Sequence, residues 1–125
     1  MSKVIISGAA GRMGRSLVAG VQESNEFMLL GAFESEGNEL LGQDAGELAG
    51  IGKSGVLLSA TDKSLTEQAE VMIDFSSPSA SILNAEICAE FGTALVIGTT
   101  GIDSEQEGVL KKCADKVPIF MSPNM

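Results

Sequence analysis

The chain has 125 residues, of which 44% are hydrophobic, and this is enough for one domain with its own core. Its formal net charge of −9 argues against nucleic acid and anionic membranes as partners, because both require a basic surface. Without histidine, a long apolar run or a signal-peptide pattern at its start, we expect a cytoplasmic protein with no metal site and no membrane span.

The first forty residues carry the strongest local signal. Residues 3–8 form a short apolar, β-branched run that predicts a buried strand, and residues 11–24 predict an amphipathic helix. The apolar stripe of this helix consists of Met13, Leu17, Val18 and Val21. Between strand and helix, glycine recurs as G-x-x-G-x-x-G at Gly8, Gly11 and Gly14, a variant of the dinucleotide-binding fingerprint.

Each glycine of this pattern has a physical role. Gly8 lets the chain leave the strand sharply, Gly11 leaves room for a pyrophosphate, and Gly14 allows the helix to pack closely on the sheet. The pyrophosphate would lie on free N–H groups at the positive end of the helix. Taken alone, the same pattern also fits a tight turn with no ligand.

The second strand is predicted over residues 28–34 and ends at Glu34, about twenty residues beyond Gly14, where the hydroxyls of an adenosine ribose would lie. Residues 35–55 contain six glycines and only scattered apolar residues. We interpret them as a long excursion with a helical turn around residues 40–41 and a docked loop at 47–48.

Strands and helices then alternate along the rest of the chain. Strands are predicted near 56–59, 71–75, 94–98 and 117–121, and helices near 63–69, 79–91 and 104–114. This order predicts an α/β fold, a Rossmann-type doubly wound parallel sheet of about six strands with helices on both faces. Cys88 and Cys113 fall on separate helices, and we expect two free thiols.

Two more motifs follow strand ends and should meet the glycine turn at one edge of the sheet. In Asp74-Phe-Ser-Ser-Pro78, a serine either caps the next helix or contacts a ligand. Gly98-Thr-Thr-Gly101 is either a simple connection or a place for close approach and hydrogen bonds at the nicotinamide end. No side chain stands out as a general base: Asp103 fits a helix cap, and Lys63 and Lys116 fit the polar surface.

These motifs, in this order and spacing, resemble the 4-hydroxy-tetrahydrodipicolinate reductase family, also called dihydrodipicolinate reductases, of lysine and diaminopimelate biosynthesis. The matching stretches are residues 4–15, 41–48, 71–78, 96–101 and 122–125. The resemblance covers essentially the whole chain but only the N-terminal part of the family's length. It implies that residues 1–125 are a dinucleotide-binding domain and that a C-terminal domain for substrate binding and oligomerisation lies outside this chain. The family's catalytic residues would lie there, so we assign no catalytic residue here.

The resemblance also implies a role for each matching residue. Gly8 to Met13 would wrap the pyrophosphate and adenosine ribose, with Arg12 near the phosphates. Glu34 would bind the ribose hydroxyls, and Ser35 stands where many relatives have an arginine for a 2′-phosphate, which favours NADH over NADPH. The complete predicted cofactor site is Gly8, Ala9, Ala10, Gly11, Arg12, Met13, Glu34, Ser35, Phe75, Ser76, Gly98, Thr99, Thr100, Ser122, Pro123, Asn124 and Met125.

In this set Phe75 and Ser76 would line the middle of the groove, residues 98–100 would meet the nicotinamide, and residues 122–125 would form the floor. The implied reaction is hydride transfer from NADH or NADPH to the imine of a small cyclic dicarboxylate, giving tetrahydrodipicolinate. The family implies a homotetramer for the full-length protein. We expect this chain alone to be monomeric, to bind cofactor weakly and to turn nothing over.

Two other classes remain open from the residues. One is a sensory or regulatory NAD-binding module without catalysis, which would need no motif at the nicotinamide end. The other is a nucleotide or coenzyme A binder. Lys53, in the 35–55 excursion, could add a basic contact to the site.

Overall fold

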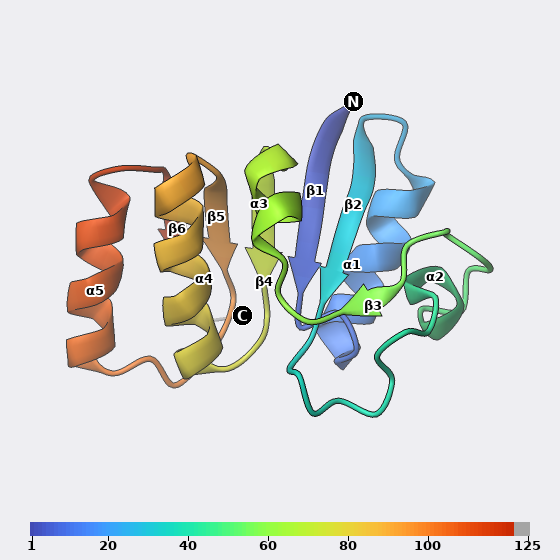
Figure 1. Ribbon diagram of the computed structural model, residues 1–125, viewed down its shortest axis with the longest axis horizontal. Coiled ribbons are helices and arrows are strands. Elements are labelled where there is room, and N and C mark those ends of the chain that lie inside the picture. The colour runs from blue at the N-terminus through green and yellow to red at the C-terminus, as the bar shows by residue number, and fades with distance from the viewer. Residues whose placement is uncertain (122–125) are drawn as a thin grey trace.

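The computed structural model describes residues 1–121, and within them six strands form one fully parallel sheet (Figure 1). The strand order is β3-β2-β1-β4-β5-β6, so the direction of winding reverses between β1 and β4. The strands are β1 (Ser2–Ser7), β2 (Phe27–Phe33), β3 (Leu58–Ser59), β4 (Val71–Asp74), β5 (Ala94–Ile97) and β6 (Ile119–Met121). This topology confirms the predicted doubly wound fold.

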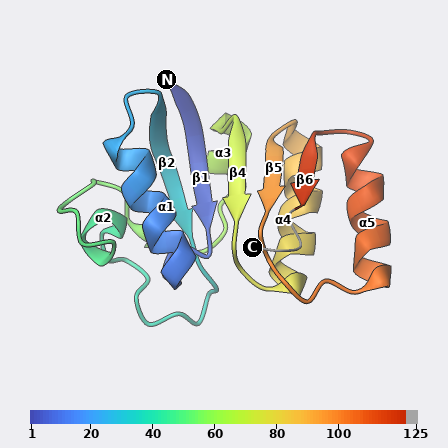
Figure 2. The ribbon, with the colours of Figure 1, turned by 180° about the vertical axis from the view of Figure 1, so that it is seen from behind.

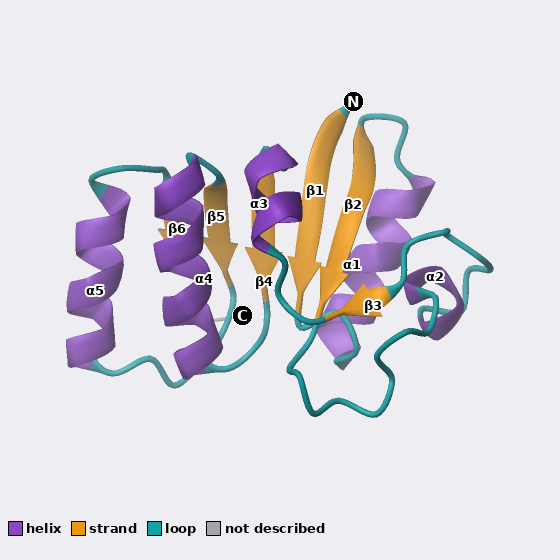
Figure 3. Ribbon diagram, in the orientation of Figure 1, coloured by secondary structure: helices purple, strands orange, loops and turns teal. Residues whose placement is uncertain are grey.

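Helices cover both faces of the sheet. They are α1 (Arg12–Glu23), α2 (Ala45–Leu48), α3 (Lys63–Gln68), α4 (Pro78–Phe91) and α5 (Ser104–Ala114). Helices α3, α4 and α5 lie in front of the sheet in Figure 1, and the view from behind shows α1 against the opposite face of β1 and β2 (Figure 2). The short α2 lies beyond the β3 edge, inside the long excursion (Figure 3).

The core has two parts because β1 is buried on both faces. Ile5 belongs to the same buried cluster as Phe33 and residues of α4 and α5, whereas Val4 and Ile6 belong to a second cluster with Val18 on the α1 side. A parallel strand covered on both sides needs a continuous apolar run, and this explains why residues 4–6 are all β-branched. Full burial of each such side chain is worth about 1.5–3 kcal/mol relative to exposure.

The register of the sheet brings four turns to the same edge. Ser7 pairs with Phe33 on one side and with Asp74 on the other, and Asp74 pairs with Ile97. The next residues along each strand are Gly8, Glu34, Phe75 and Gly98. Four positions predicted for the cofactor site therefore leave the sheet at one level, although up to 90 residues separate them along the chain.

The excursion differs from its prediction. Its short helix, α2, covers the predicted docked loop at 47–48, whereas residues 39–42 form hydrogen-bonded turns in which Asn38 Oδ1 accepts the Leu40 N–H. Asp44 is the N-cap of α2. The Asp44 carboxylate accepts N–H groups from Gly46 and Glu47 and also from Ser54 and Gly55 across the loop. These bonds, above all that from the Ser54 N–H, hold the pKa of Asp44 well below its usual value, although burial acts against them.

Three further expectations can be compared with the described residues. Met13 is 45% exposed and lies outside the core, so the buried part of the α1 stripe is shorter than predicted. Cys88 and Cys113 are free and buried, as expected. Among residues 1–121, no helix combines the length and the apolar character needed to cross a membrane.

Candidate cofactor-binding site

A groove of about 680 Å³ runs along the carboxyl edge of the sheet, across the point between β1 and β4 where the winding reverses. Ligands of doubly wound sheets bind at this place. Its walls come from the turns after β1, β2 and β4, from the segment leading into α3, and from α4. The lining residues are Ser7, Gly8, Gly11, Glu34, Ser35, Glu36, Thr61, Lys63, Phe75, Ser76, Ser77, Ala80, Leu83 and Ile87.

The glycine turn is held tightly against its neighbours. Gly8 has φ +81°, and a Cβ there would overlap the backbone carbonyl of Phe75. A Cβ on Gly14 would overlap the Gly8 carbonyl and lie 2.7 Å from the Cα of Ala9. Gly14 thus allows α1 to approach the turn itself, a closer contact than the helix–sheet packing expected. At Gly11 a Cβ would meet only the Gly8 carbonyl oxygen, at 3.4 Å.

The N-terminus of α1 differs from those of the other described helices. Its N-cap, Gly11, has no side chain to accept a hydrogen bond, and its first turn holds no acidic residue. In contrast, side chains cap α2, α3, α4 and α5, namely Asp44, Asp62, Ser77 and Asp103. The first N–H groups of α1 are therefore left without a side-chain acceptor at the positive end of its dipole. This arrangement suits a phosphate or another anion.

Glu34 faces the same turn from the end of β2. Its Oε2 accepts the Ala10 N–H at 3.1 Å, and its Oε1 accepts the N–H of Ser35 at 3.2 Å. The carboxylate thus spans the gap between the β1 and β2 turns, and Ser35 and Glu36 continue the wall of the groove. A carboxylate in this place can accept hydrogen bonds from sugar hydroxyls.

A buried polar cluster joins the turns after β4 and β5. Asp74 is fully buried, and its Oδ1 accepts both the N–H of Ser76, at 3.0 Å, and the Ser76 hydroxyl. Thr99 Oγ1 accepts the same N–H at 3.1 Å and the Ser81 hydroxyl at 2.9 Å. Burial raises the pKa of the Asp74 carboxyl, while the hydrogen bonds from Ser76 act in the opposite direction.

This cluster changes how the Gly-Thr-Thr-Gly turn is understood. The Thr99 hydroxyl is used inside the protein, so its side chain fixes the turn instead of extending into the groove. The exposed Thr100 and the buried Thr99 line a separate hollow of about 110 Å³ beside α5. A Cβ on Gly98 would overlap the ring of Phe75, which places that ring directly on the β5 turn.

The structure brings six of the predicted site residues into the groove: Gly8, Gly11, Glu34, Ser35, Phe75 and Ser76. Thr99 and Thr100 lie in the second hollow. Ala9, Ala10, Arg12, Met13 and Gly98 adjoin these residues along the chain without lining either space. The predicted positions Ser122, Pro123, Asn124 and Met125 lie outside the described residues.

Eight lining residues are absent from the cofactor site predicted from the sequence. For three of them a signal existed, because Ala80, Leu83 and Ile87 follow a capping Ser77 at helical spacing and form one face of α4. Lys63 was interpreted as a surface residue, and this is incomplete, since it also lines the groove. Its position depends on the path of the chain from β3 to α3, which no local pattern encodes. Lys53, considered as a basic contact, does not line the groove.

Comparison with known proteins agrees with this geometry. A family model described as "Dihydrodipicolinate reductase, N-terminus" matches residues 2–125. The 4-hydroxy-tetrahydrodipicolinate reductase of Citrifermentans bemidjiense is 39% identical over 125 residues, which are 100% of this chain and 47% of that protein. The enzyme of the same name from Rhodopseudomonas palustris strain BisB5 is 45% identical over 123 residues, 98% of this chain and 45% of that protein.

Among solved structures, the dipicolinate-bound dihydrodipicolinate reductase of Paenisporosarcina sp. TG-14 has a TM-score of 0.75 to this chain. It is 23% identical, and the alignment covers 98% of this chain and 47% of that one. At this identity the likeness shows the fold alone. The chain spans about half the length of the curated relatives it matches.

Proposed function

Since this chain belongs to the dihydrodipicolinate reductase family and matches its N-terminal nucleotide-binding part, we propose that it holds the nicotinamide cofactor of an NAD(P)H-dependent reductase. The observation that carries the proposal is the uncapped N-terminus of α1, at one wall of a groove across the winding reversal. The family match favours this function over a sensory module and over a coenzyme A binder.

Each part of the groove has a role in this proposal. The glycine turn and the first N–H groups of α1 hold the pyrophosphate, with Arg12 close to it, and Glu34 accepts hydrogen bonds from the adenosine ribose. Phe75 and Ser76 line the middle, and the turn at residues 98–100, which adjoins the groove at the Phe75 ring, meets the nicotinamide. Ser122 to Met125, outside the described residues, complete the floor. NADH is favoured, because a carboxylate beside an uncharged Ser35 repels a 2′-phosphate.

The cofactor supplies a hydride, which we propose passes to the imine carbon of a small cyclic dicarboxylate, as the names of the relatives suggest. The residues of this chain orient the cofactor and shield it from water on the sheet side. The groups that bind the dicarboxylate and supply the proton belong to a second domain outside this chain, which also forms the tetramer. The chain alone therefore binds cofactor without turning over substrate.

Calorimetric titration of the chain with NADH and NADPH tests the proposal. We expect both to bind, NADH more tightly, and no oxidation of NADH when the cyclic imine substrate is added. Glu34→Ala should weaken the binding of NADH by about tenfold or more, the value of a hydrogen bond to a charged group. It should weaken the binding of NADPH less, because the repulsion of the 2′-phosphate is lost together with the carboxylate. The matched control is Glu23→Ala, an exposed glutamate at the end of α1 remote from the groove.

Two results would overturn this function. If neither nucleotide binds, the groove is not a cofactor site. If the chain alone catalyses steady turnover, the division of the reaction between two domains is wrong.

A further inference from the structure

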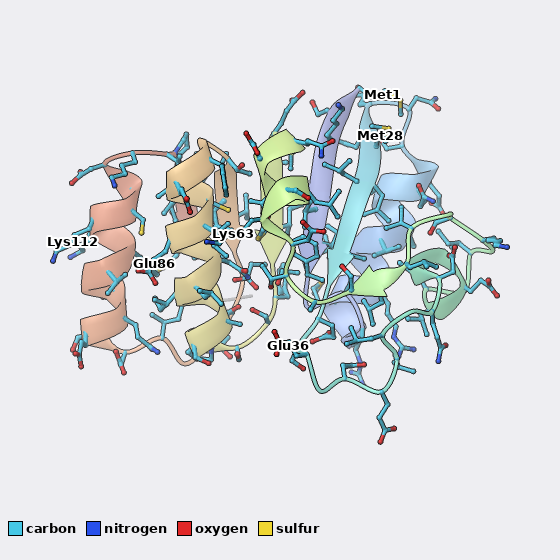
Figure 4. The ribbon with its side chains drawn as sticks, viewed as in Figure 1. Met1, Met28, Glu36, Lys63, Glu86 and Lys112 are labelled. Atoms are coloured by element: carbon cyan, nitrogen blue, oxygen red, sulfur yellow. The ribbon has the colours of Figure 1, made fainter. Side chains whose placement is uncertain are left out.

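One cation lines the groove within residues 1–121, and the mechanism above does not use it. Lys63 is the first residue of α3 and lies between α3 and α4 (Figure 4), and it lines the same groove as Ser35 and Glu36. The other charged lining residues are both acidic, Glu34 and Glu36. Lys63 is therefore the lining side chain that can balance a negative ligand in this groove.

The contacts of Lys63 leave it able to move. Its Nζ lies 3.8 Å from Glu90 Oε2, and the two side chains are 63% and 57% exposed. A long, solvent-exposed ion pair of this kind contributes little to stability, so giving it up costs little. Asp62, the neighbouring acid, does not compete, because its Oδ1 accepts hydrogen bonds from Ser64 and Leu65 as the cap of α3.

The walls of the groove indicate which part of a dinucleotide lies near Lys63. Ala80, Leu83 and Ile87 form an apolar face on α4 that suits a purine base, and Glu34 stands where the attached ribose is held. The segment from Thr61 to Lys63 lines the same groove, and α3 packs beside α4. A ribose held by Glu34, with its base on α4, would place its 2′ oxygen in the groove that Lys63 also lines.

We propose that Lys63 determines how well the chain accepts a 2′-phosphorylated dinucleotide. This inference rests on the proposed function and refines it. Ser35 brings no charge to the 2′ position, so the phosphate of NADPH meets the carboxylate of Glu34 without a counter-charge unless Lys63 reaches it. A lysine offers a mobile point charge and no bidentate fork, so NADPH is tolerated while NADH is still preferred.

The test compares paired nucleotides on single variants by calorimetric titration. NADPH is compared with NADH, and 2′,5′-ADP with 5′-AMP, so that the second pair reports on the adenosine end alone. Lys63→Gln should weaken the binding of NADPH and of 2′,5′-ADP by about tenfold. It should change the affinity for NADH and for 5′-AMP by less than about twofold. The control, Lys53→Gln, removes an exposed lysine that does not line the groove and should change none of the four.

A second variant tests whether the ion pair of Lys63 competes with its binding of a phosphate. Glu90→Gln removes the ion-pair partner of Lys63, so it should leave NADPH affinity unchanged or raise it by up to about threefold. Raising the salt concentration should reduce the difference in NADPH affinity between the wild type and Lys63→Gln, because salt screens the charge of Lys63. Because the Lys63 side chain is exposed, the urea midpoint of the variant should equal that of the wild type.

The outcomes separate this inference from the proposed function. If Lys63→Gln weakens the binding of the 2′-phosphorylated and unphosphorylated ligands equally, or weakens neither, Lys63 does not interact with the 2′-phosphate and the inference is wrong. In that case the cofactor site itself still stands. If the wild-type chain binds none of the four nucleotides, both the proposed function and this inference fail.

Discussion

Helix α1 contains two glycines for which the same substitution should have opposite effects. Gly20 is exposed, and a Cβ there would meet nothing within 4 Å, so Gly20→Ala only removes the backbone entropy cost of glycine. This gain is about 1 kcal/mol in a helix interior. Gly14 lies in the first turn of the same helix, where a Cβ would overlap the carbonyl of Gly8.

The loss of folding stability in Gly14→Ala can be estimated from the overlap with the Gly8 carbonyl. The overlapping atoms belong to the backbone of a turn that is itself hydrogen-bonded, since Gly8 and Ala9 both donate to the Phe33 carbonyl at 2.9 and 3.1 Å. The turn cannot move away as a flexible side chain could, so the overpacking cost lies near 3 kcal/mol, the upper end of its usual range. After the propensity gain, Gly14→Ala should destabilise the chain by about 2 kcal/mol.

Urea unfolding and thermal melting measure the difference in stability between Gly14→Ala and Gly20→Ala. The two variants should differ by about 3 kcal/mol, or about 12 °C in Tm for a domain of this size, with the wild type between them. Gly14→Ala should also weaken nucleotide binding, because the turn it displaces forms the wall of the groove, and Gly20→Ala should not. If both substitutions stabilise the chain, α1 does not rest on the glycine turn and the geometry of the site described above is wrong.

Three further predictions concern side chains that the structure shows in hydrogen bonds or in the core. Because the pKa of Asp44 is lowered in the folded chain, the stability that its carboxylate contributes is fully present above pH 3.8 and is lost as the pH falls through the folded-state pKa. Asp44→Asn should lower the Tm at pH 7 and make the Tm depend less on pH in acid. Melting curves from pH 2 to 7 measure both effects. Asp103 and Gln106 form a capping box on α5, so Asp103→Ala should cost about 1 kcal/mol in urea unfolding, and an unchanged midpoint would contradict the cap. Burial, with smaller contributions from Asp74 and Cys113, raises the pKa of Cys88 to about 12, which leaves a thiolate fraction of ~10⁻⁴ at pH 8. Iodoacetamide should therefore label Cys88 in urea but not in the folded chain, and rapid native labelling detected by mass spectrometry would refute its burial.

The sequence alone was sufficient to predict the strands and the four longer helices of residues 1–121, in their order. Continuous apolar runs, glycine at the ends of strands and capping residues such as Asp62, Ser77 and Asp103 act over a few residues, so their effects can be recognised locally. The strand ends of a parallel sheet meet at one edge, and this made Gly8, Glu34 and Phe75 predictable as neighbours. The glycine turn and the acid after β2 were identified for the same reason.

Features that depend on contacts between residues far apart along the chain could be found only in the tertiary structure. The place of α2 follows from Asp44, whose acceptors are satisfied by Ser54 and Gly55, and no helical periodicity signals such a loop-spanning cap. The Thr99 hydroxyl points inward because Ser76 and Ser81, 23 and 18 residues away along the chain, lie beside it. Lys63 reached the groove through the path of an irregular loop. Patterns of local sequence describe what each segment prefers, whereas hydrogen-bond partners and charges across a groove are set only when the segments pack together.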